Sequence, residues 1–185
     1  PMARKSDKHN RLIDAAKKVL YRIGAGQVKF LIIGDGEFNN FLRSYAREIG
    51  VERDTTFLGW RENLDGLYVD LDVVALTSLN EGTPVSIIEA MAAGKAVIST
   101  DVGGVRDLII DNENGILSKE NDTDDFSDKL YALLSDREKR LALGGRGREY
   151  VRNKYNIERL VSDIKNLYDE CLSLNAQKIR GRRRG

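Results

Sequence analysis

Two spacings of apolar residues alternate along most of the chain. Over residues 7–23 apolar side chains recur at every third or fourth position, which is typical of an amphipathic helix. Residues 28–33 instead form a short and mostly apolar run rich in β-branched side chains, which predicts a buried strand. Glycines at positions 34 and 36 then predict a tight turn, and strands and helices continue to alternate beyond it.

The same two patterns predict the elements of the rest of the chain. Further strands are predicted at residues 55–58, 71–77, 96–100 and 115–117. Further helices are predicted at residues 38–49, 84–93, 124–134, 137–153 and 157–174. Apolar strands that alternate with helices indicate a parallel sheet covered on both faces, because each connecting helix returns over the sheet. The predicted fold class is therefore α/β, a doubly wound and Rossmann-like parallel sheet.

The two ends of the chain modify this picture. A strand normally precedes the first helix of such a sheet, but the helix predicted at 7–23 begins almost at once. We therefore expect that a first strand is missing and that the chain is the second part of something longer. Residues 1–175 are expected to form one domain, followed by a basic, flexible tail at 176–185.

Charge and composition exclude several classes of protein. The 30 basic and 29 acidic residues give a net charge of +1, and the basic excess lies in the tail, so a nucleic-acid-binding body is not expected. The single cysteine, Cys171, excludes an intrachain disulfide scaffold. No apolar run is long enough to cross a bilayer and no secretory signal is recognisable, which predicts a cytoplasmic protein. The basic tail is expected to be solvated, with contact to the inner face of an anionic membrane as the alternative.

Candidate chemistry lies in the loops that follow the predicted strands, because ligands of such sheets bind outside the carboxyl ends of the strands. In the loop after residues 71–77, Thr83 suits the N-cap of a helix and Pro84 suits its first position. The free amides of that first turn, together with the helix dipole, make an anion site.

Two carboxylates accompany this turn. Glu89 lies four residues after Val85, and its side chain leans back toward the start of the helix, where we expect it to be half-buried. Together with Glu81 it could accept hydrogen bonds from the hydroxyl groups of a sugar. The ordinary alternative is that Glu81 is a loop acid and that Glu89 lies on the solvent face of the helix.

Residues 80–105, NEGTPVSIIEAMAAGKAVISTDVGGV, closely resemble the donor-binding half of retaining, GT-B type glycosyltransferases of the large family 4 class. The hallmark of that family is two glutamates separated by seven residues, here Glu81 and Glu89. The resemblance extends from Met2 to about Leu172, through FLIIGDGE at 30–37 and TFLGWRENLDGLY at 56–68.

The resemblance implies a role for each matching residue. Arg4 and Lys8 would neutralise the donor diphosphate, although their spacing is shorter than usual in the family and Lys5 competes with Lys8 for the role. Trp60 and Arg61 would flank the base.

The two glutamates have different implied roles. Glu89 would bind the ribose hydroxyls, and Glu81 would be catalytic. Glu81 would also surround the transferred sugar together with the residues that follow it: Gly82, Thr83, Pro84 and Val85.

The family activity implied by these residues is transfer of a sugar from a nucleotide sugar, with a UDP-sugar as the preferred donor, to an acceptor hydroxyl. No cofactor and no metal are expected, since His9 is the only histidine and no cluster of ligands has metal-binding spacing. The acceptor, a glycan or a lipid-linked glycan, would bind mainly to a missing N-terminal domain. We therefore expect donor binding and little or no transfer by this chain alone.

Three other functions can be weighed against this one. A non-catalytic module that binds a nucleotide or nucleotide sugar would need only a domain of this size. A dinucleotide-binding domain is disfavoured, because Asn39 stands where the third glycine of the fingerprint should be. A glycosidase that uses Glu81 and Glu89 as its pair of carboxylates is also disfavoured, since a hydrolase needs no anion site.

Overall fold

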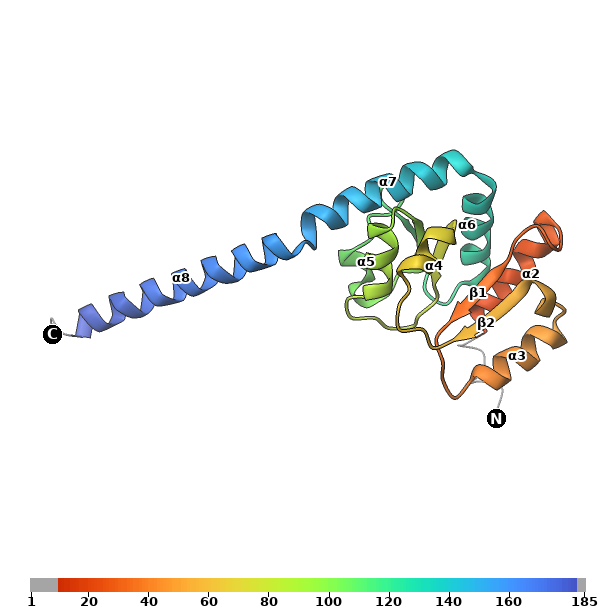
Figure 1. The fold of residues 1–185 in the computed structure, drawn as a ribbon, viewed down its shortest axis with the longest axis horizontal. Helices are drawn as coiled ribbons and strands as arrows, with labels where there is room; N and C mark the ends of the chain where they lie inside the picture. Colours follow the sequence, from red (N-terminus) through yellow and green to blue (C-terminus); the bar gives the residue numbers. More distant parts are fainter. Residues whose placement is uncertain (1–9, 183–185) are drawn as a thin grey trace.

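The computed structural model describes residues 10–182, apart from the side chains of Asp65 and of residues 174–182. The elements follow one another as α2 (Arg11–Ile23), β1 (Phe30–Ile33), α3 (Asn39–Glu48), the 3₁₀ turn η1 (Glu52–Asp54), β2 (Thr55–Gly59), α4 (Asp65–Asp70), β3 (Val73–Leu76), α5 (Val85–Ala92), β4 (Ala96–Thr100), the 3₁₀ turn η2 (Gly103–Asp107), β5 (Ile116–Ser118), α6 (Thr123–Ser135), α7 (Arg137–Lys154) and α8 (Ile157–Arg182) (Figure 1).

All strand pairs are parallel, which confirms the predicted α/β class. β1 pairs with β2, with Phe30 opposite Thr55, and β4 lies between β3 and β5. The strands therefore form a two-stranded and a three-stranded sheet rather than one continuous sheet. β4 has a neighbour on each side, and all of its residues are buried.

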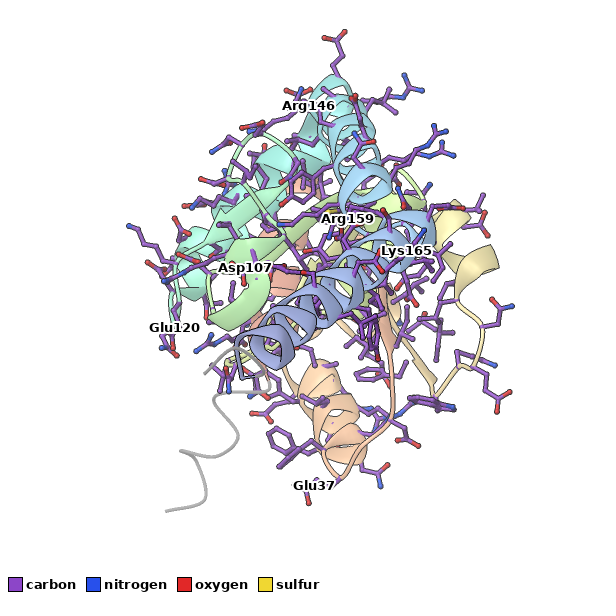
Figure 2. The ribbon with its side chains drawn as sticks, turned by 90° about the vertical axis from the view of Figure 1, so that its left-hand side faces the viewer. Glu37, Asp107, Glu120, Arg146, Arg159 and Lys165 are labelled. Atoms are coloured by element: carbon purple, nitrogen blue, oxygen red, sulfur yellow. The ribbon has the colours of Figure 1, made fainter. Side chains whose placement is uncertain are left out.

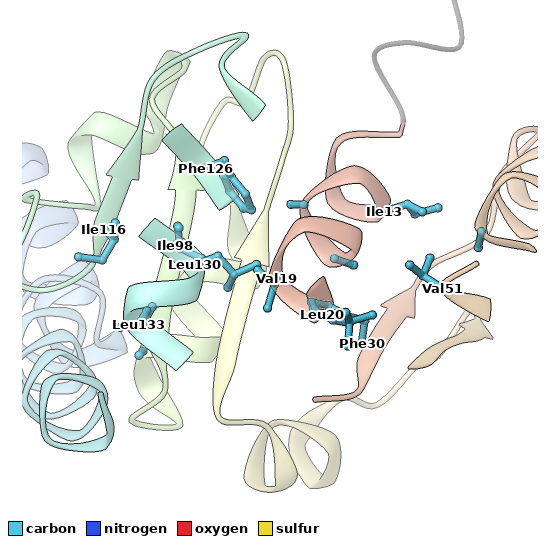
Figure 3. Packing of buried hydrophobic residues seen from close by; sticks show 14 of the residues in the cluster. Ile13, Val19, Leu20, Phe30, Val51, Ile98, Ile116, Phe126, Leu130 and Leu133 are labelled. Atoms are coloured by element: carbon cyan, nitrogen blue, oxygen red, sulfur yellow. The ribbon is translucent and has the colours of Figure 1, made fainter. Parts of the chain in front are cut away.

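Helices cover the strands on two faces. On one face α2, α3 and α6 pack with β1 and with part of β4 in a first apolar cluster, in which Val19 of α2 lies near Leu130 of α6 (Figure 3). On the other face α4 and α5 form a second cluster around Tyr68 and Ile87. The apolar residues of α2 recur at every third or fourth position and so form one stripe along the helix. Because this stripe is the only apolar side of α2, the helix packs with it facing the first cluster.

Two helices differ from the prediction. α4 lies between the strands predicted at residues 55–58 and 71–77, where no helix was predicted, and α8 continues to Arg182, past the expected end at residue 174 and into the expected flexible tail. α8 extends away from the strands (Figure 1), and residues 157–173 on it are exposed, including Arg159 and Lys165 (Figure 2). Within the described part of the chain, no helix is both long enough and apolar enough to cross a membrane.

An ion pair between a buried carboxylate and an exposed lysine holds the start of β2 against the loop before β1. Asp54 has a side chain only 8% exposed, and Lys29 Nζ donates to its Oδ1 at 2.6 Å. The hydrogen bond from Lys29, assisted by the amide of Gly26, holds the pKa of this carboxyl below its ordinary value, although burial acts the other way. A carboxyl whose pKa is lowered by folding stabilises the protein above its unfolded pKa and loses that effect as the pH falls.

We therefore expect Asp54→Asn to lower the Tm at pH 7, and the difference from the parent chain to shrink as the pH falls below about 4, toward the lowered pKa of the folded state. Thermal unfolding of both chains between pH 7 and pH 3 measures this. Asp128→Asn is the control, because its ion pair with Arg22 at 2.6 Å is exposed and is expected to contribute little. A difference between Asp54→Asn and the parent that does not change with pH would contradict the prediction.

Candidate functional site

A cavity of about 540 Å³ opens where β1 and β2 end, and we call it the edge cavity. It is lined by Ile33, Gly34, Trp60, Arg61, Glu62, Asn63, Leu64 and Glu89. The loops after β1 and β2 supply most of this lining, and α5 supplies Glu89. The structure thus brings together three residues that lie far apart in the sequence and that the resemblance assigns to one nucleoside: Trp60, Arg61 and Glu89.

Glu89 is more exposed than expected. Ile87, Ala90 and Met91 form the buried side of α5, which leaves Glu89 on the open side. Its carboxylate accepts a hydrogen bond from the hydroxyl of Tyr68 at 3.0 Å. The prediction of a half-buried side chain was wrong, because α5 packs with its apolar side inward and leaves Glu89 exposed, with Tyr68 as a buried partner.

Tyr68 is a residue of the site that sequence reasoning missed. It lies on α4, is only 4% exposed, and its hydroxyl is also 3.3 Å from the carbonyl oxygen of Ser86. A buried phenol held against α5 orients the carboxylate of Glu89 with respect to the edge cavity. The four-residue spacing between Leu64 and Tyr68 is compatible with one helix face, but it is too short a pattern to predict a helix.

The start of α5 differs from the prediction by one position. Pro84, not Thr83, is the N-cap, with φ −72° and ψ 102°, and its carbonyl accepts from the amides of Ile87 and Ile88. The amides of Val85 and of the next residue therefore have no partner within the helix. Val85 is 61% exposed, so this turn opens to solvent and keeps the character of an anion site.

The residues that the resemblance assigns to the sugar lie in the loop between β3 and α5 and at the first position of α5: Glu81, Gly82, Thr83, Pro84 and Val85. None of them lines the edge cavity. The first three of them lie instead against η2, where the amide of Gly104 donates to the carbonyl of Glu81 at 2.9 Å. The structure therefore separates the predicted site into two neighbouring parts, which α5 joins, with Val85 at its start and Glu89 about one turn further along.

Two glycines of η2 permit this contact. A Cβ added to Gly103 would lie 2.2 Å from the carbonyl oxygen of Glu81, and Gly103 also has φ +46°, which side chains disfavour. A Cβ added to Gly104 would lie 1.9 Å from the carbonyl oxygen of Gly82. Any larger residue at either position must push the loop away from η2.

We expect Gly104→Ala to lower the free energy of unfolding by about 1–2 kcal/mol, because backbone must move to admit the methyl group. Urea unfolding of the two chains measures this. Gly36→Ala is the matched control. Gly36 also lies outside the α-helices and strands, but a Cβ there meets nothing within 4 Å. Equal stability of Gly104→Ala and Gly36→Ala would show that the contact between η2 and the loop is loose.

Few of the described residues place a positive charge near the carboxyl ends of the strands. Arg61 lines the edge cavity, and Arg106 donates to Asp101 Oδ1 at 2.6 Å just after β4. The hydrogen bond and charge of Asp101 raise the pKa of Arg106. Among residues 10–182, no three side chains of His, Cys, Asp or Glu come together as metal ligands could, and metal independence stays a prediction.

The residues that the resemblance assigns to the diphosphate are not placed. Arg4 and Lys8, together with the competing Lys5, lie outside the residues that the structure describes. Their role stays a prediction.

Comparison with known proteins identifies the family. The model of the family described as "Glycosyl transferases group 1" matches residues 3–150. The chain belongs to this glycosyltransferase family. The match includes the edge cavity, the loop between β3 and α5, and η2.

Curated relatives in this glycosyltransferase family are considerably longer than the chain. This chain is 31% identical over 170 residues to N-acetyl-alpha-D-glucosaminyl L-malate synthase of Bacillus anthracis. The matched residues make up 91% of this chain and 44% of the relative. It is also 31% identical over 156 residues to an Escherichia coli UDP-Gal:alpha-D-GlcNAc-diphosphoundecaprenol alpha-1,3-galactosyltransferase, covering 84% of the chain and 40% of the relative. The chain thus spans less than half the length of these proteins.

Solved glycosyltransferases have the same fold. The structure of Anabaena HepE in complex with UDP matches this chain with a TM-score of 0.79 at 22% sequence identity. The match covers 87% of this chain and 44% of the HepE chain. The C-terminal domain of the group 1 glycosyltransferase LpcC from Francisella tularensis has a TM-score of 0.72 at 28% identity, with 83% of this chain and 82% of that one covered. These neighbours confirm the Rossmann-like α/β architecture.

Proposed function

We propose that this glycosyltransferase chain binds the nucleotide-sugar donor of a retaining, family 4 enzyme. The reaction would transfer a hexose to an acceptor hydroxyl, with a UDP-sugar as the preferred donor and without a metal. The edge cavity carries the proposal, because it combines an exposed aromatic ring, a cation and an oriented carboxylate at the carboxyl ends of parallel strands.

Each group of the cavity suits one part of a nucleoside. Trp60 is 73% exposed and offers a face on which a base can stack. Glu89, held by Tyr68, can accept hydrogen bonds from two ribose hydroxyls, which is the role that ionised carboxylates serve in sugar binding. Arg61 would lie beside the base.

The second part of the site would receive the phosphates and the sugar. The unpartnered amides at the start of α5 and the positive end of its dipole would stabilise the diphosphate as it leaves, with Arg4 and Lys8 as further cations. Glu81 would be the catalytic residue beside the sugar. In the transfer, the bond from the anomeric carbon to the phosphate oxygen would break, the acceptor oxygen would bond to that carbon, and the proton of the acceptor hydroxyl would pass to an oxygen of the leaving diphosphate.

Relatives support this choice of donor. HepE was solved with UDP, and a mutant of Staphylococcus aureus TarM, with a TM-score of 0.79 at 27% identity over 88% of this chain and 33% of that one, was solved with UDP and alpha-GlcNAc-glycerol. The E. coli relative is named for UDP-Gal and a diphosphoundecaprenol acceptor. A glycan or lipid-linked glycan acceptor, bound largely by a separate N-terminal domain, is part of the proposal, as is little or no transfer by this chain alone.

The test uses Trp60, the only tryptophan of the chain, as a reporter. We expect its fluorescence to change saturably on titration with UDP or a UDP-sugar and much less with GDP. Free tryptophan amide titrated in parallel controls for absorption of light by the nucleotide. A folded chain that binds none of these nucleotides would contradict donor binding.

A non-catalytic nucleotide-sugar module is the second candidate, since the chain by itself carries only the donor part of the proposed reaction. Titration alone does not separate the two. Transfer of a radiolabelled sugar to an acceptor by the longer protein would exclude the module, and binding without any transfer would favour it.

A further inference from the structure

One side of α8 is apolar and uncovered. α8 extends away from the strands (Figure 1), and the large apolar side chains described on it are between 45% and 67% exposed. They form what we call the α8 stripe: Ile157, Leu160, Val161, Ile164, Leu167, Tyr168 and Leu172. Helices in proteins owe most of their stability to the packing of such a side, but residues 157–173 of α8 are all exposed.

The spacing of the α8 stripe is that of a coiled coil. Its apolar residues recur at steps of three and four, so positions a and d of a seven-residue repeat can be assigned. Counted from Ile157, these positions hold Ile157, Leu160, Ile164, Leu167, Cys171 and Leu174. The repeat spans three heptads and ends where Lys178 and Gly181 take the next a and d positions. Such a repeat indicates a helix that pairs with another helix along its length.

The described part of the chain offers α8 no partner helix of its own. Outside α8, the large apolar side chains that it exposes lie singly on separate elements, such as Tyr21 on α2, Val69 on α4 and Leu141 on α7. A second copy of the chain, by contrast, presents the same stripe. Two identical stripes can cover each other under two-fold symmetry, because the same surface then serves both molecules.

The residue types in the repeat favour two parallel helices. Ile157 and Ile164 occupy position a, and Leu160 and Leu167 occupy position d. A β-branched residue at a with leucine at d is the combination that selects two strands in a parallel coiled coil.

The charges beside the stripe favour the same orientation. Asp163 and Glu170 occupy position g, and the apolar Val161 and Tyr168 occupy position e. In a parallel pair, g of one helix faces e of the other, so Asp163 would lie beside Tyr168 of the second copy and no like charges would meet. In an antiparallel pair g faces g, and the acidic residues of the two copies would repel one another.

The area of the α8 stripe is sufficient for a dimer of moderate affinity. Burying a side chain of this kind removes on the order of 100 Å² from water. Two stripes of seven side chains would therefore bury about 1,000 Å² or more, which lies at the lower end of specific interfaces.

We propose that α8 joins two copies of this chain in a parallel, two-stranded coiled coil over residues 157–174. The inference does not rest on the nucleotide-sugar proposal, because α8 lies outside the edge cavity and outside the residues that match the family, 3–150. Position a pairs with itself in such a dimer, so Cys171 of one copy lies beside Cys171 of the other. This cysteine is exposed in the single chain and can report the pairing.

Sedimentation equilibrium of the 185-residue chain at concentrations from about 1 to 100 μM tests the association. We expect the mass to rise with concentration from the 20.8 kDa of one chain to twice that value. Ile164→Lys places a charge in the interface and is expected to raise the Kd at least about 100-fold. Asn166→Lys is the matched control, because it adds the same charge to the opposite side of α8, and it is expected to change the Kd by less than about threefold.

Oxidation by diamide, which joins two thiols in a disulfide, tests the parallel arrangement. We expect chains linked through Cys171 to form at least about tenfold faster in the parent chain and in Asn166→Lys than in Ile164→Lys. In an antiparallel pair centred on the repeat, the two Cys171 residues would lie roughly 16 Å apart along the helices. A dimer that forms no such disulfide would overturn the parallel arrangement.

A chain that stays monomeric at every concentration would overturn the proposal. Hydrogen exchange of that monomer would then identify the cover of α8: slow exchange would mean that α8 packs on its own domain, and fast exchange that its partner is a different protein. Equal dimerisation of Ile164→Lys and Asn166→Lys would overturn the proposal as well, because it would place the contact between copies on another surface.

Discussion

Gly144→Ala is expected to lower the free energy of unfolding by about 2–3 kcal/mol. Gly144 is a buried position of α7, where the helix crosses the turn that joins α5 to β4. A Cβ there would lie 2.1 Å from the carbonyl oxygen of Gly94 and 3.3 Å from the amide nitrogen of Ala96. Both neighbours are backbone, so the methyl group can be admitted only if α7 moves away from β4 and leaves gaps along that contact.

Gly145→Ala is the matched control, and it is expected to change the free energy of unfolding in the opposite direction. Gly145 lies on the same helix, is exposed, and would place a Cβ within 4 Å of nothing. Alanine is a better helix former than glycine by up to about 1 kcal/mol, so Gly145→Ala is expected to stabilise the protein. Urea unfolding of the three chains measures both effects. If the two substitutions shift the midpoint in the same direction, α7 does not pack against Gly94 as closely as described.

Elements with a long or unbroken apolar pattern could be predicted from the sequence. The strand at Ala96–Thr100 has the predicted bounds, and α2 ends at Ile23 as predicted, because burial on every side or on one clear stripe determines those patterns. α4 was missed because a helix of six residues has too few turns to show a period. The start of α5 shifted by one residue, since Pro84 is as compatible with an N-cap as with the first helical position.

The candidate site, like the fold, could be predicted from the sequence only in part. The rule that ligands bind at the carboxyl ends of parallel strands pointed to the loops that form the edge cavity, and Trp60, Arg61 and Glu89 share that cavity. That Tyr68 would contact Glu89 could not be predicted, because it depends on how α4 packs against α5. The exposure of Glu89 has the same origin. Separation of the strands into two sheets is likewise a property of packing between elements and not of any one segment.

Glu89→Gln is expected to weaken binding of the nucleotide that the chain prefers by about 10- to 100-fold. A carboxylate that accepts from two hydroxyls contributes about 1.5–3 kcal/mol through charged hydrogen bonds, and the amide keeps the shape of the side chain but loses the charge. The hydrogen bond from Tyr68 can persist to the amide oxygen, so the Tm is expected to change little. Titration followed by Trp60 fluorescence measures the affinity.

Glu62→Gln separates a specific role from a general effect of charge, because Glu62 lines the same cavity but has no proposed contact with the ribose. It is expected to change affinity by less than about twofold, as a solvated charge does. Equal losses in the two variants would mean that the cavity responds only to net charge. Unchanged affinity in Glu89→Gln would mean that the ribose lies elsewhere, and the anion site at the start of α5 would then have to account for nucleotide binding by itself.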